Sequence, residues 1–436
     1  MRIKPFIVTG ILLLLLLASN PVRMLQAQSG LEYQEPSVLI PVDLMGGFNR
    51  YNLVIPSFLP IAASGSLGED AGRLQKRLST NLDMTGYFQL LDPRSSLESN
   101  PRAGLAPETP IDYAPWAQIG ANFVIKGAIE QRGSRLTLEL RLFDISTGTQ
   151  LLAKRYTGPV KDARKMINRF TNEVLLVITG ERGVFGSQII FLSDSSVMMT
   201  ELGADEAEGV SGSRAGNAFF PTIGYGGRTA WTRQNGNKWE LVADGKVVYS
   251  GELVIAPAFS PSGVLAAGFS GPSSTNIAVF ENRTPRVITR GGNLEISPTF
   301  SPDGSRMAYV SDQGGSAGIY IAPASGGTGQ RLSPPGKSTD PSWSPKGDKI
   351  AFVLRERDIC VINADGSGLV QLTSGQGVNR HPSFSPDGRM IVFHTSRGGK
   401  NQLYVMAANG DRQQPLIPEF TGTQTLPTWS PEMPEM

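Results

Sequence analysis

The phrase Pro298-Thr299-Phe300-Ser301-Pro302-Asp303-Gly304 recurs throughout the second half of the chain. Its aromatic position repeats at spacings of 41, 43, 41 and 45 residues. A period in the low forties is typical of the four-stranded blades of a β-propeller, in which each blade needs its neighbours to cover its apolar faces. The other copies are Pro257-Ala258-Phe259-Ser260-Pro261-Ser262-Gly263, Pro341-Ser342-Trp343-Ser344-Pro345-Lys346-Gly347, Pro382-Ser383-Phe384-Ser385-Pro386-Asp387-Gly388, Pro427-Thr428-Trp429-Ser430-Pro431 and a degenerate Pro221-Thr222-Ile223-Gly224-Tyr225.

Each repeat contains the signals for four strands. The aromatic residue ends a short strand, Ser-Pro interrupts the ladder because proline has no N–H, and Asp-Gly is expected to supply the positive φ angles of a tight hairpin turn. Alternating strands follow, as at 307–310 and 319–322, and a short last strand comes after a glycine turn, as at 330–332. The pattern therefore predicts one four-stranded sheet per repeat.

The two ends of the repeat array complement each other. Residues 187–214 contain the later strands of a unit but lack its first strand, whereas residues 426–431 supply a first strand with nothing after it. We expect residues 426–431 to pair with the strand near Gln188 and Ile190. This pairing would close a six-bladed ring and hide two sheet edges that would otherwise favour aggregation. An open solenoid or a seven-bladed ring are the alternatives.

The chain ahead of the repeats has a different pattern. Apolar residues at helical spacing predict a helix that starts at 68–70 and includes Leu82, and a second helix over 160–179 that ends at Gly180. Strands are expected at 37–42, 51–55, 88–91, 123–129, 136–143 and 151–156, with a helical turn at Trp116. The predicted fold is mostly β, a six-bladed β-propeller over 187–436 preceded by a small α/β domain over 28–180.

Residues 1–27 have the pattern of a secretory signal peptide. Arg2 and Lys4 precede an apolar run of about 13 residues, which is shorter than a membrane-spanning helix needs. We expect cleavage after Ala27 and export of the mature chain. Cys360, the one cysteine of the chain, lies in a strand-like segment and is interpreted as a small buried hydrophobe.

The charge balance excludes partners of strong charge. The chain has 40 Lys and Arg against 38 Asp and Glu, and removal of residues 1–27 leaves 37 against 38. Such a balance gives no basic surface for nucleic acid or for an anionic membrane. We therefore expect a protein that binds no nucleic acid.

Several motifs resemble catalytic or binding sites, but the sequence around each one does not fit such a site. Residues 314–318 match G-x-S-x-G but lie between two blade strands, whereas a hydrolase needs a strand-to-helix elbow. Residues 336–338 resemble the end of a phosphate loop that lacks its first glycine. His381 and His394 are too few for a zinc site. Asp303, Asp365 and Asp387 each precede a glycine and are interpreted as turn residues. The sequence predicts no catalytic residue, metal or cofactor.

The loops that enter the innermost strands vary in sequence while their neighbours repeat. Because all of them enter the innermost strand from the same side of the ring, they should gather around one mouth of the central channel. Loops on a rigid scaffold often form a binding surface, and unselected connectors are the alternative. These loops are 217–220, 253–256, 293–297, 337–340, 376–381 and 422–426.

The export signal, the small α/β domain and the six repeats together resemble the TolB family of the Tol-Pal system. The most specific similarities are the repeated phrases, the terminal Pro427-Thr428-Trp429-Ser430-Pro431 and the junction over 179–185. The resemblance implies a non-enzymatic adaptor of the Gram-negative periplasm that supports outer-membrane integrity and constriction during division. It also implies two partners, the peptidoglycan-associated lipoprotein Pal at the propeller mouth and TolA at the mature N-terminus.

Carried onto this chain, the resemblance implies a set of contact residues. The implied protein is a monomer that reaches the membranes only through its partners. The rival class is an exported enzyme or carbohydrate-binding protein with converging carboxylates, histidines or a metal in the channel. The polar candidates for Pal are Glu295, Thr339, Asp340, Asn379, Arg380, His381, Gln424 and Thr425, and those for TolA lie within 28–35 and include Gln28, Leu31 and Tyr33.

Overall fold

The fold was analysed in a computed structural model of the chain. The structure describes residues 50–62, 71–106, 109–213, 217–271, 274–281, 284–291 and 294–435. The predicted signal peptide, the predicted strand at 37–42 and the candidate residues Gln28, Leu31 and Tyr33 lie outside the described residues.

The first part of the described chain contains a mixed sheet. Its strand order is β3-β1-β4-β5-β6, with β2 paired to β4. Strand β1 runs parallel to both β3 and β4, whereas β4, β5 and β6 are antiparallel. The sheet confirms the small mixed sheet expected for an α/β domain. Its strands are β1 (Tyr51–Val54), β2 (Leu59–Pro60), β3 (Phe88–Leu90), β4 (Phe123–Arg132), β5 (Arg135–Asp144) and β6 (Thr149–Pro159).

Two long helices pack beside this sheet, α2 (Ala71–Met84) and α4 (Ala163–Thr179). Leu74, Leu78 and Leu82 of α2 are buried at the helical spacing that predicted this element. Helix α4 follows a 3₁₀ turn over Val160–Asp162 and ends at Gly180, which has a φ of 75°. Glycine adopts this left-handed conformation without the strain of a side chain, so it ends the helix at the predicted residue. The short α3 (Ala114–Gln118) carries the buried Trp116.

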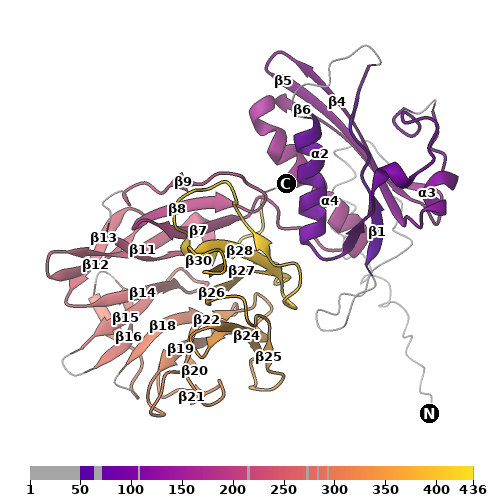
Figure 1. The fold of residues 1–436 in the computed structure, drawn as a ribbon. Coiled ribbons are helices and arrows are strands. Elements are labelled where there is room, and N and C mark those ends of the chain that lie inside the picture. Colours follow the sequence, from indigo (N-terminus) through magenta and orange to yellow (C-terminus); the bar gives the residue numbers. More distant parts are fainter. Residues whose placement is uncertain are drawn as a thin grey trace, which may run out of the picture. The chain divides into compact units, whose positions relative to one another are not determined.

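The rest of the described chain forms six four-stranded sheets, which we number as blades (Figure 1). Blade 1 contains β30 (Thr425–Trp429), β7 (Gln188–Ser193), β8 (Ser196–Glu201) and β9 (Glu208–Gly209), and blade 2 contains β10 (Ala218–Ile223), β11 (Thr229–Asn235), β12 (Lys238–Ala243) and β13 (Lys246–Gly251). Blade 3 contains β14 (Val254–Phe259), β15 (Leu265–Ser270), β16 (Thr275–Glu281) and β17 (Thr284–Val287), and blade 4 contains β18 (Glu295–Phe300), β19 (Arg306–Ser311), β20 (Gly318–Pro323) and β21 (Gln330–Arg331). Blade 5 contains β22 (Ser338–Trp343), β23 (Lys349–Leu354), β24 (Asp358–Asn363) and β25 (Val370–Gln371), and blade 6 contains β26 (Asn379–Phe384), β27 (Met390–Thr395), β28 (Gln402–Ala407) and β29 (Gln414–Pro415).

The last strand of the chain closes the ring. Thr428 of β30 pairs with Ile190 of β7, and Trp429 pairs with Ile189, as the sequence predicted. In Figure 1 the yellow β30 lies beside the magenta β7, although the two strands are more than two hundred residues apart in sequence. The buried Trp429 ring donates from Nε1 to Ser187 Oγ at 2.7 Å. The propeller therefore has six blades, and its first blade is completed by the C-terminal strand.

The turns of the repeated phrase differ from the prediction in one respect. Gly304 and Gly388 have φ angles of 70° and 75°, but neither Asp303 nor Asp387 has a positive φ. Instead, Asp303 Oδ1 accepts from the backbone N–H of Ser305 at 3.0 Å. The expectation that Asp and Gly both adopt positive φ was wrong because the aspartate caps the turn through its side chain and leaves the left-handed position to glycine alone.

Candidate functional site at the propeller mouth

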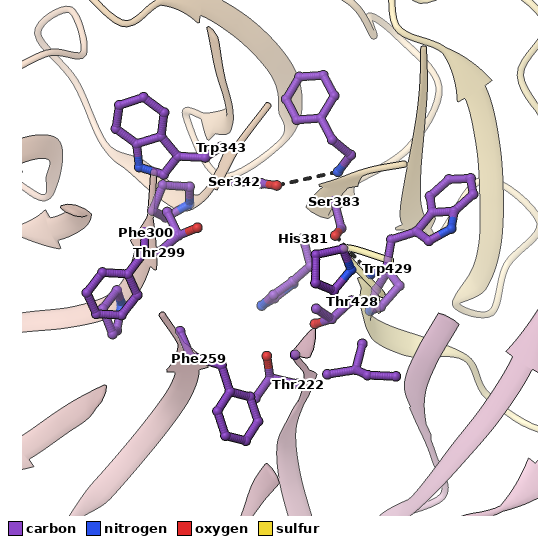
Figure 2. A pocket seen from close by; sticks show the side chains of 18 of the residues that line it. Thr222, Phe259, Thr299, Phe300, Ser342, Trp343, His381, Ser383, Thr428 and Trp429 are labelled. Carbon is purple, nitrogen blue, oxygen red and sulfur yellow. Dashed lines mark hydrogen bonds between the residues drawn. The ribbon is translucent and has the colours of Figure 1, made fainter. Parts of the chain in front are cut away.

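A cavity of about 250 Å³ lies on the propeller axis and is lined by the innermost strands of all six blades. These strands are β30, β10, β14, β18, β22 and β26, the ones that carry the repeated proline. Figure 2 shows side chains from every blade around this opening. The loops that the sequence analysis grouped therefore do lead into one central channel.

Six non-glycine residues around this channel have a left-handed backbone. Each directly precedes the repeated proline, and each lies within a break in strand register between the innermost strand and its neighbour. Proline cannot donate to the ladder, and the resulting bulge places the residue before it at positive φ. A left-handed L-residue costs about 1–2 kcal/mol, and such strain concentrates at functional sites. The six residues, which we call the rim residues, are Leu426, Phe220, Ala256, Ser297, Asp340 and His381, with φ angles of 54°, 50°, 49°, 54°, 55° and 51°.

The rim residues divide the mouth into two halves. Blades 1, 2 and 3 contribute Leu426, Phe220 and Ala256, which are apolar. Blades 4, 5 and 6 contribute Ser297, Asp340 and His381, which are polar or ionisable. Because blades 1–3 and 4–6 are consecutive around the ring, the mouth has one apolar half and one polar half.

A ring of hydroxyl groups lies one residue beyond the prolines. Thr222, Thr299, Ser342, Ser383 and Thr428 occupy this position in five blades, and Ala258 occupies it in blade 3 (Figure 2). Ser383 Oγ accepts from the Trp429 N–H at 2.9 Å, Ser342 Oγ accepts from the Phe384 N–H at 3.4 Å, and Thr428 Oγ1 donates to the Pro221 carbonyl at 3.1 Å. Each of these bonds joins adjacent blades, so the hydroxyls hold the channel wall together.

The polar half contains both histidines of the chain. The rings of His381 and His394 stack with centroids 5.1 Å apart and an interplanar angle of 24°. His381 Nε2 lies 3.3 Å from Asp340 Oδ1. Burial is the main cause that lowers the pKa of His381, and the Arg380 guanidinium lowers it further, whereas the Asp340 carboxylate raises it. Burial also lowers the pKa of His394 well below 6.5. Both rings are therefore neutral at neutral pH.

The predicted Pal-contacting residues fall into two groups. Thr339, Asp340, Arg380, His381 and Thr425 are partly exposed around the mouth. Glu295, Asn379 and Gln424 have no exposed surface, because they begin or directly precede the innermost strands and their side chains are covered by neighbouring structure. Gln424, for example, accepts from the Leu403 N–H at 2.8 Å and donates to the Phe420 carbonyl at 3.2 Å. The first group can face a partner directly, and the second can only position the strands that do.

The catalytic motifs have structural roles. Residues 314–317 form the loop between β19 and β20 rather than a strand-to-helix elbow. Hydrogen bonds from Ser301 and Ser305 lower the pKa of Asp303 to about 2, so this carboxylate is an ionised turn cap. Asp340 is the one carboxylate that lines the described channel. Burial raises the pKa of the Cys360 thiol to about 11, in agreement with a buried hydrophobic role.

The described residues contain neither a cluster of metal ligands nor a membrane-spanning helix. No group of three or more His, Cys, Asp or Glu side chains among them could hold a metal ion. No helix in the same part of the chain is long and apolar enough to cross a membrane.

The sequence analysis did not predict three features of the site, which are the strain at the rim residues, the hydroxyl ring and the role of His394. The repeated proline was recognised as a ladder break, and this signal could have located the bulge and the rim residue before it. His394 carried no such signal, because its partners come from strands distant in sequence.

These features define a class of protein, a closed six-bladed β-propeller preceded by a small α/β domain. The model of the TolB β-propeller domain matches residues 242–433, and that of the TolB amino-terminal domain matches residues 46–151. A protein of Chlorobium luteolum called Protein TolB homolog is 30% identical over 401 residues, covering 88% of this chain and 91% of that protein. The chain therefore belongs to the TolB family, and with it to the Tol-Pal system.

Further relatives agree with this assignment. A Protein TolB homolog of Chlorobium chlorochromatii is 38% identical over 280 residues, which cover 61% of this chain and 62% of that protein. The Tol-Pal system protein TolB of Syntrophus aciditrophicus is 32% identical over 145 residues, covering 33% of this chain and 32% of that protein. The crystal structure of TolB from Acinetobacter baumannii has a TM-score of 0.74 at 21% identity over 89% of this chain and 98% of that one, which supports the fold.

Proposed function

We propose that the chain is a periplasmic adaptor that binds the lipoprotein Pal through the propeller mouth and TolA through residues 28–35. In this role it would support outer-membrane integrity and constriction during division. Membership of the TolB family supports a place in the Tol-Pal system. The two-sided mouth, with six strained rim residues on a rigid ring, is the observation that carries the docking site.

The mouth has the chemistry of a protein-docking surface. An apolar side chain of a partner would pack against the Leu426, Phe220 and Ala256 half, and a polar one would meet Asp340, Arg380 and His381. Because the rim is held by strand pairing and inter-blade hydrogen bonds, docking would order few groups of the propeller. Shape and orientation would then be recognised with a small entropic cost.

A pair of matched variants tests the Pal site. Binding of purified Pal to the mature chain should weaken at least about tenfold when Asp340→Ala is combined with Arg380→Ala, because truncation of buried or half-buried charged contacts costs a few kcal/mol. The control is Glu281→Ala with Arg286→Ala, which likewise removes one acidic and one basic side chain, here from the outer strands of blade 3, where the two lie 3.5 Å apart. Equal binding by wild type and the mouth variant would refute this docking surface.

Deletion of residues 28–35 tests the TolA site. The deleted protein should lose TolA binding while its affinity for Pal stays within about twofold, since the two sites are proposed to be separate. Mass spectrometry of the protein from the envelope fraction tests export, and an N-terminus near Gln28 is expected. Retained TolA binding by the deletion variant, or an uncleaved N-terminus, would contradict the corresponding part of the proposal.

A further inference from the structure

The two histidines of the chain form one cluster that spans three blades. His381 lies on β26 and stacks on His394 of β27, both in blade 6, and His381 faces Asp340 of blade 5. His394 is 6% exposed, whereas the side chain of His381 is 27% exposed at the mouth. The cluster therefore connects the open channel with a buried position behind its wall.

The contact with blade 1 determines which ring nitrogen of His394 carries the proton. Its Nδ1 accepts a hydrogen bond from the backbone N–H of Leu426 at 3.4 Å. An accepting ring nitrogen carries no proton, so the proton of the neutral ring is on Nε2. A proton added at Nδ1 would replace the acceptor with a donor and place two N–H groups against each other.

Loss of the hydrogen bond to His394 would affect Leu426 at a strained point of the backbone. Leu426 is a rim residue with a φ of 54°, and it lies in β30 within the register break between Thr425 and Thr428. Strand β30 is also the strand that closes the ring. Loss of the bond from its N–H would leave a strained residue of the closing strand without this support, at the apolar half of the mouth.

His381 would respond in the opposite sense. Its Nε2 already faces Asp340 Oδ1, and protonation would convert this contact into an ion pair. Asp340 Oδ2 and His381 Nδ1 are buried and make no hydrogen bond within the described structure. Proton uptake would therefore strengthen the His381–Asp340 contact in the polar half. It would also remove the hydrogen bond that holds Leu426 in the apolar half.

The charged groups around the two rings are few. Asp340 of β22 and Arg380 of β26 face them, and Arg380 Nη2 donates to the Glu356 carbonyl at 3.2 Å. Strand β30 brings no titratable residue, and the residue of β28 that pairs with His394 is Leu403. The protonation of each histidine thus depends on burial, on the other histidine and on these two charges.

We propose that His381 and His394 form a proton-binding site that controls the shape of the propeller mouth, with Leu426 as the element that responds. In the neutral form His394 holds the start of β30 in place and the apolar half is ordered. In the protonated form this hold is lost, and the mouth no longer presents its apolar half as one surface. The effect on partner docking rests on the function proposed above, whereas the proton site itself does not.

Nuclear magnetic resonance of the mature chain tests the site directly. The chain has two histidines, so it has two imidazole signals, and the single variants assign them. We expect both signals to titrate below 6.5, with His394 the lower of the two. Amide exchange at Leu426, corrected for the intrinsic rate, should lose protection by up to about tenfold per pH unit below the His394 midpoint. A His394 midpoint at or above 6.5, or Leu426 protection that does not change with pH, would overturn the proposal.

Two variants separate the site from general acid effects. His394→Asn keeps an oxygen acceptor near the position of Nδ1 but cannot take up a proton, so Leu426 protection should become independent of pH. His381→Gln keeps a donor toward Asp340 and should leave the Leu426 response in place. The same pH response in wild type and in His394→Asn would refute a role for His394.

Binding of Pal distinguishes this inference from the proposed function. Wild type should lose affinity for Pal as the pH falls below the His394 midpoint, by up to about tenfold per pH unit, and His394→Asn should lose less than about threefold over the same range. Equal losses in the two proteins would reject the control of docking by His394. Absence of Pal binding at every pH would reject the proposed function, and the titration and exchange measurements would still decide the proton site.

Discussion

At the scale of single residues, the mouth is built from hydroxyl groups and strained backbone. Five blades carry a short hydroxyl side chain beyond the proline, and those of Ser383 and Thr428 form hydrogen bonds to the next blade. The residue before the proline is strained in all six blades, whatever its side chain. The strain therefore follows from the backbone path into the repeated proline rather than from any one residue type.

Replacement of Ser383 tests the contribution of one inter-blade bond. Ser383→Ala removes the acceptor of the buried Trp429 N–H and should lower the free energy of unfolding by about 1–3 kcal/mol. Ser342→Ala is the matched control, since its bond to the Phe384 N–H is longer at 3.4 Å and should contribute less. Urea unfolding measures both, and a larger loss in the Ser342 variant would contradict this ranking.

Ala256→Gly tests the strain at the rim. Removal of the side chain relieves a cost of about 1–2 kcal/mol at positive φ, offset by about 0.5–1 kcal/mol of glycine entropy, so the variant should be neutral or more stable by up to about 1 kcal/mol. The control is Ala258→Gly in the same strand, where φ is not positive and a loss is expected. If both variants lose the same stability by urea unfolding, residue 256 is not strained.

At the scale of elements, a buried ion pair attaches a long loop to the sheet of the α/β domain. Lys126 Nζ of β4 lies 2.6 Å from Glu98 Oε1, and the two side chains are 2% and 8% exposed. Burial lowers the pKa of Lys126, whereas the hydrogen bond to Glu98 raises it. The pair fixes the segment that follows β3 on the face of the sheet where Trp116 lies 6.0 Å from the ammonium.

Removal of one member of this buried ion pair should lower the free energy of unfolding strongly. Lys126→Met leaves a buried carboxylate without its cation and should cost about 3–5 kcal/mol, and Glu98→Leu in addition should recover most of the loss. Arg132→Met breaks the Arg132–Glu130 pair, whose arginine is 81% exposed, and should cost less than about 1 kcal/mol. Urea unfolding midpoints compare the three. A loss in the Lys126 variant as small as that of Arg132→Met would show that the buried pair is not needed.

At the scale of the whole molecule, stability depends on ring closure. Strand β30 pairs with β7 and packs against β26 and β27 of blade 6, so the same strand covers the edge of β7 and joins blade 1 to blade 6. Deletion of residues 421–436 should therefore produce oligomers or aggregates in size-exclusion chromatography. Deletion of residues 434–436 is the control and should leave a monomer. A soluble, cooperative monomer without β30 would show that closure is not required.

The buried histidines predict how the stability of the whole molecule varies with pH. Both pKa values are lowered in the folded state, so above 6.5 neither state binds the proton and the histidines have no effect. As pH falls below 6.5 the unfolded state takes up protons first, and stability falls by about 1.4 kcal/mol per pH unit for each histidine until its folded pKa is reached. Calorimetry at several pH values measures how steeply stability falls with pH in wild type and in the double variant His381→Gln with His394→Asn. Identical slopes would contradict this origin.

Much of this architecture was predictable because its signals are local and repeated. Proline, glycine and the aromatic residue recur at a blade-length spacing, and the two incomplete ends of the array predicted the pairing of Trp429 with the strand near Ile190. Helical spacing and Gly180 likewise located α2 and the end of α4. The burial of Glu295, Asn379 and Gln424 was not predictable, because it depends on the adjacent blade and not on the loop that carries them.

The sequence alone therefore determined the number of blades, their closure and the place of the mouth, since each depends on short-range turn chemistry and a regular period. Only the tertiary structure decided the division of the mouth into an apolar and a polar half, the hydroxyl ring and the meeting of His394 with Leu426. These features depend on how six separate sheets are oriented around one axis. Such contacts join residues that are far apart in the chain, and no local pattern specifies their geometry.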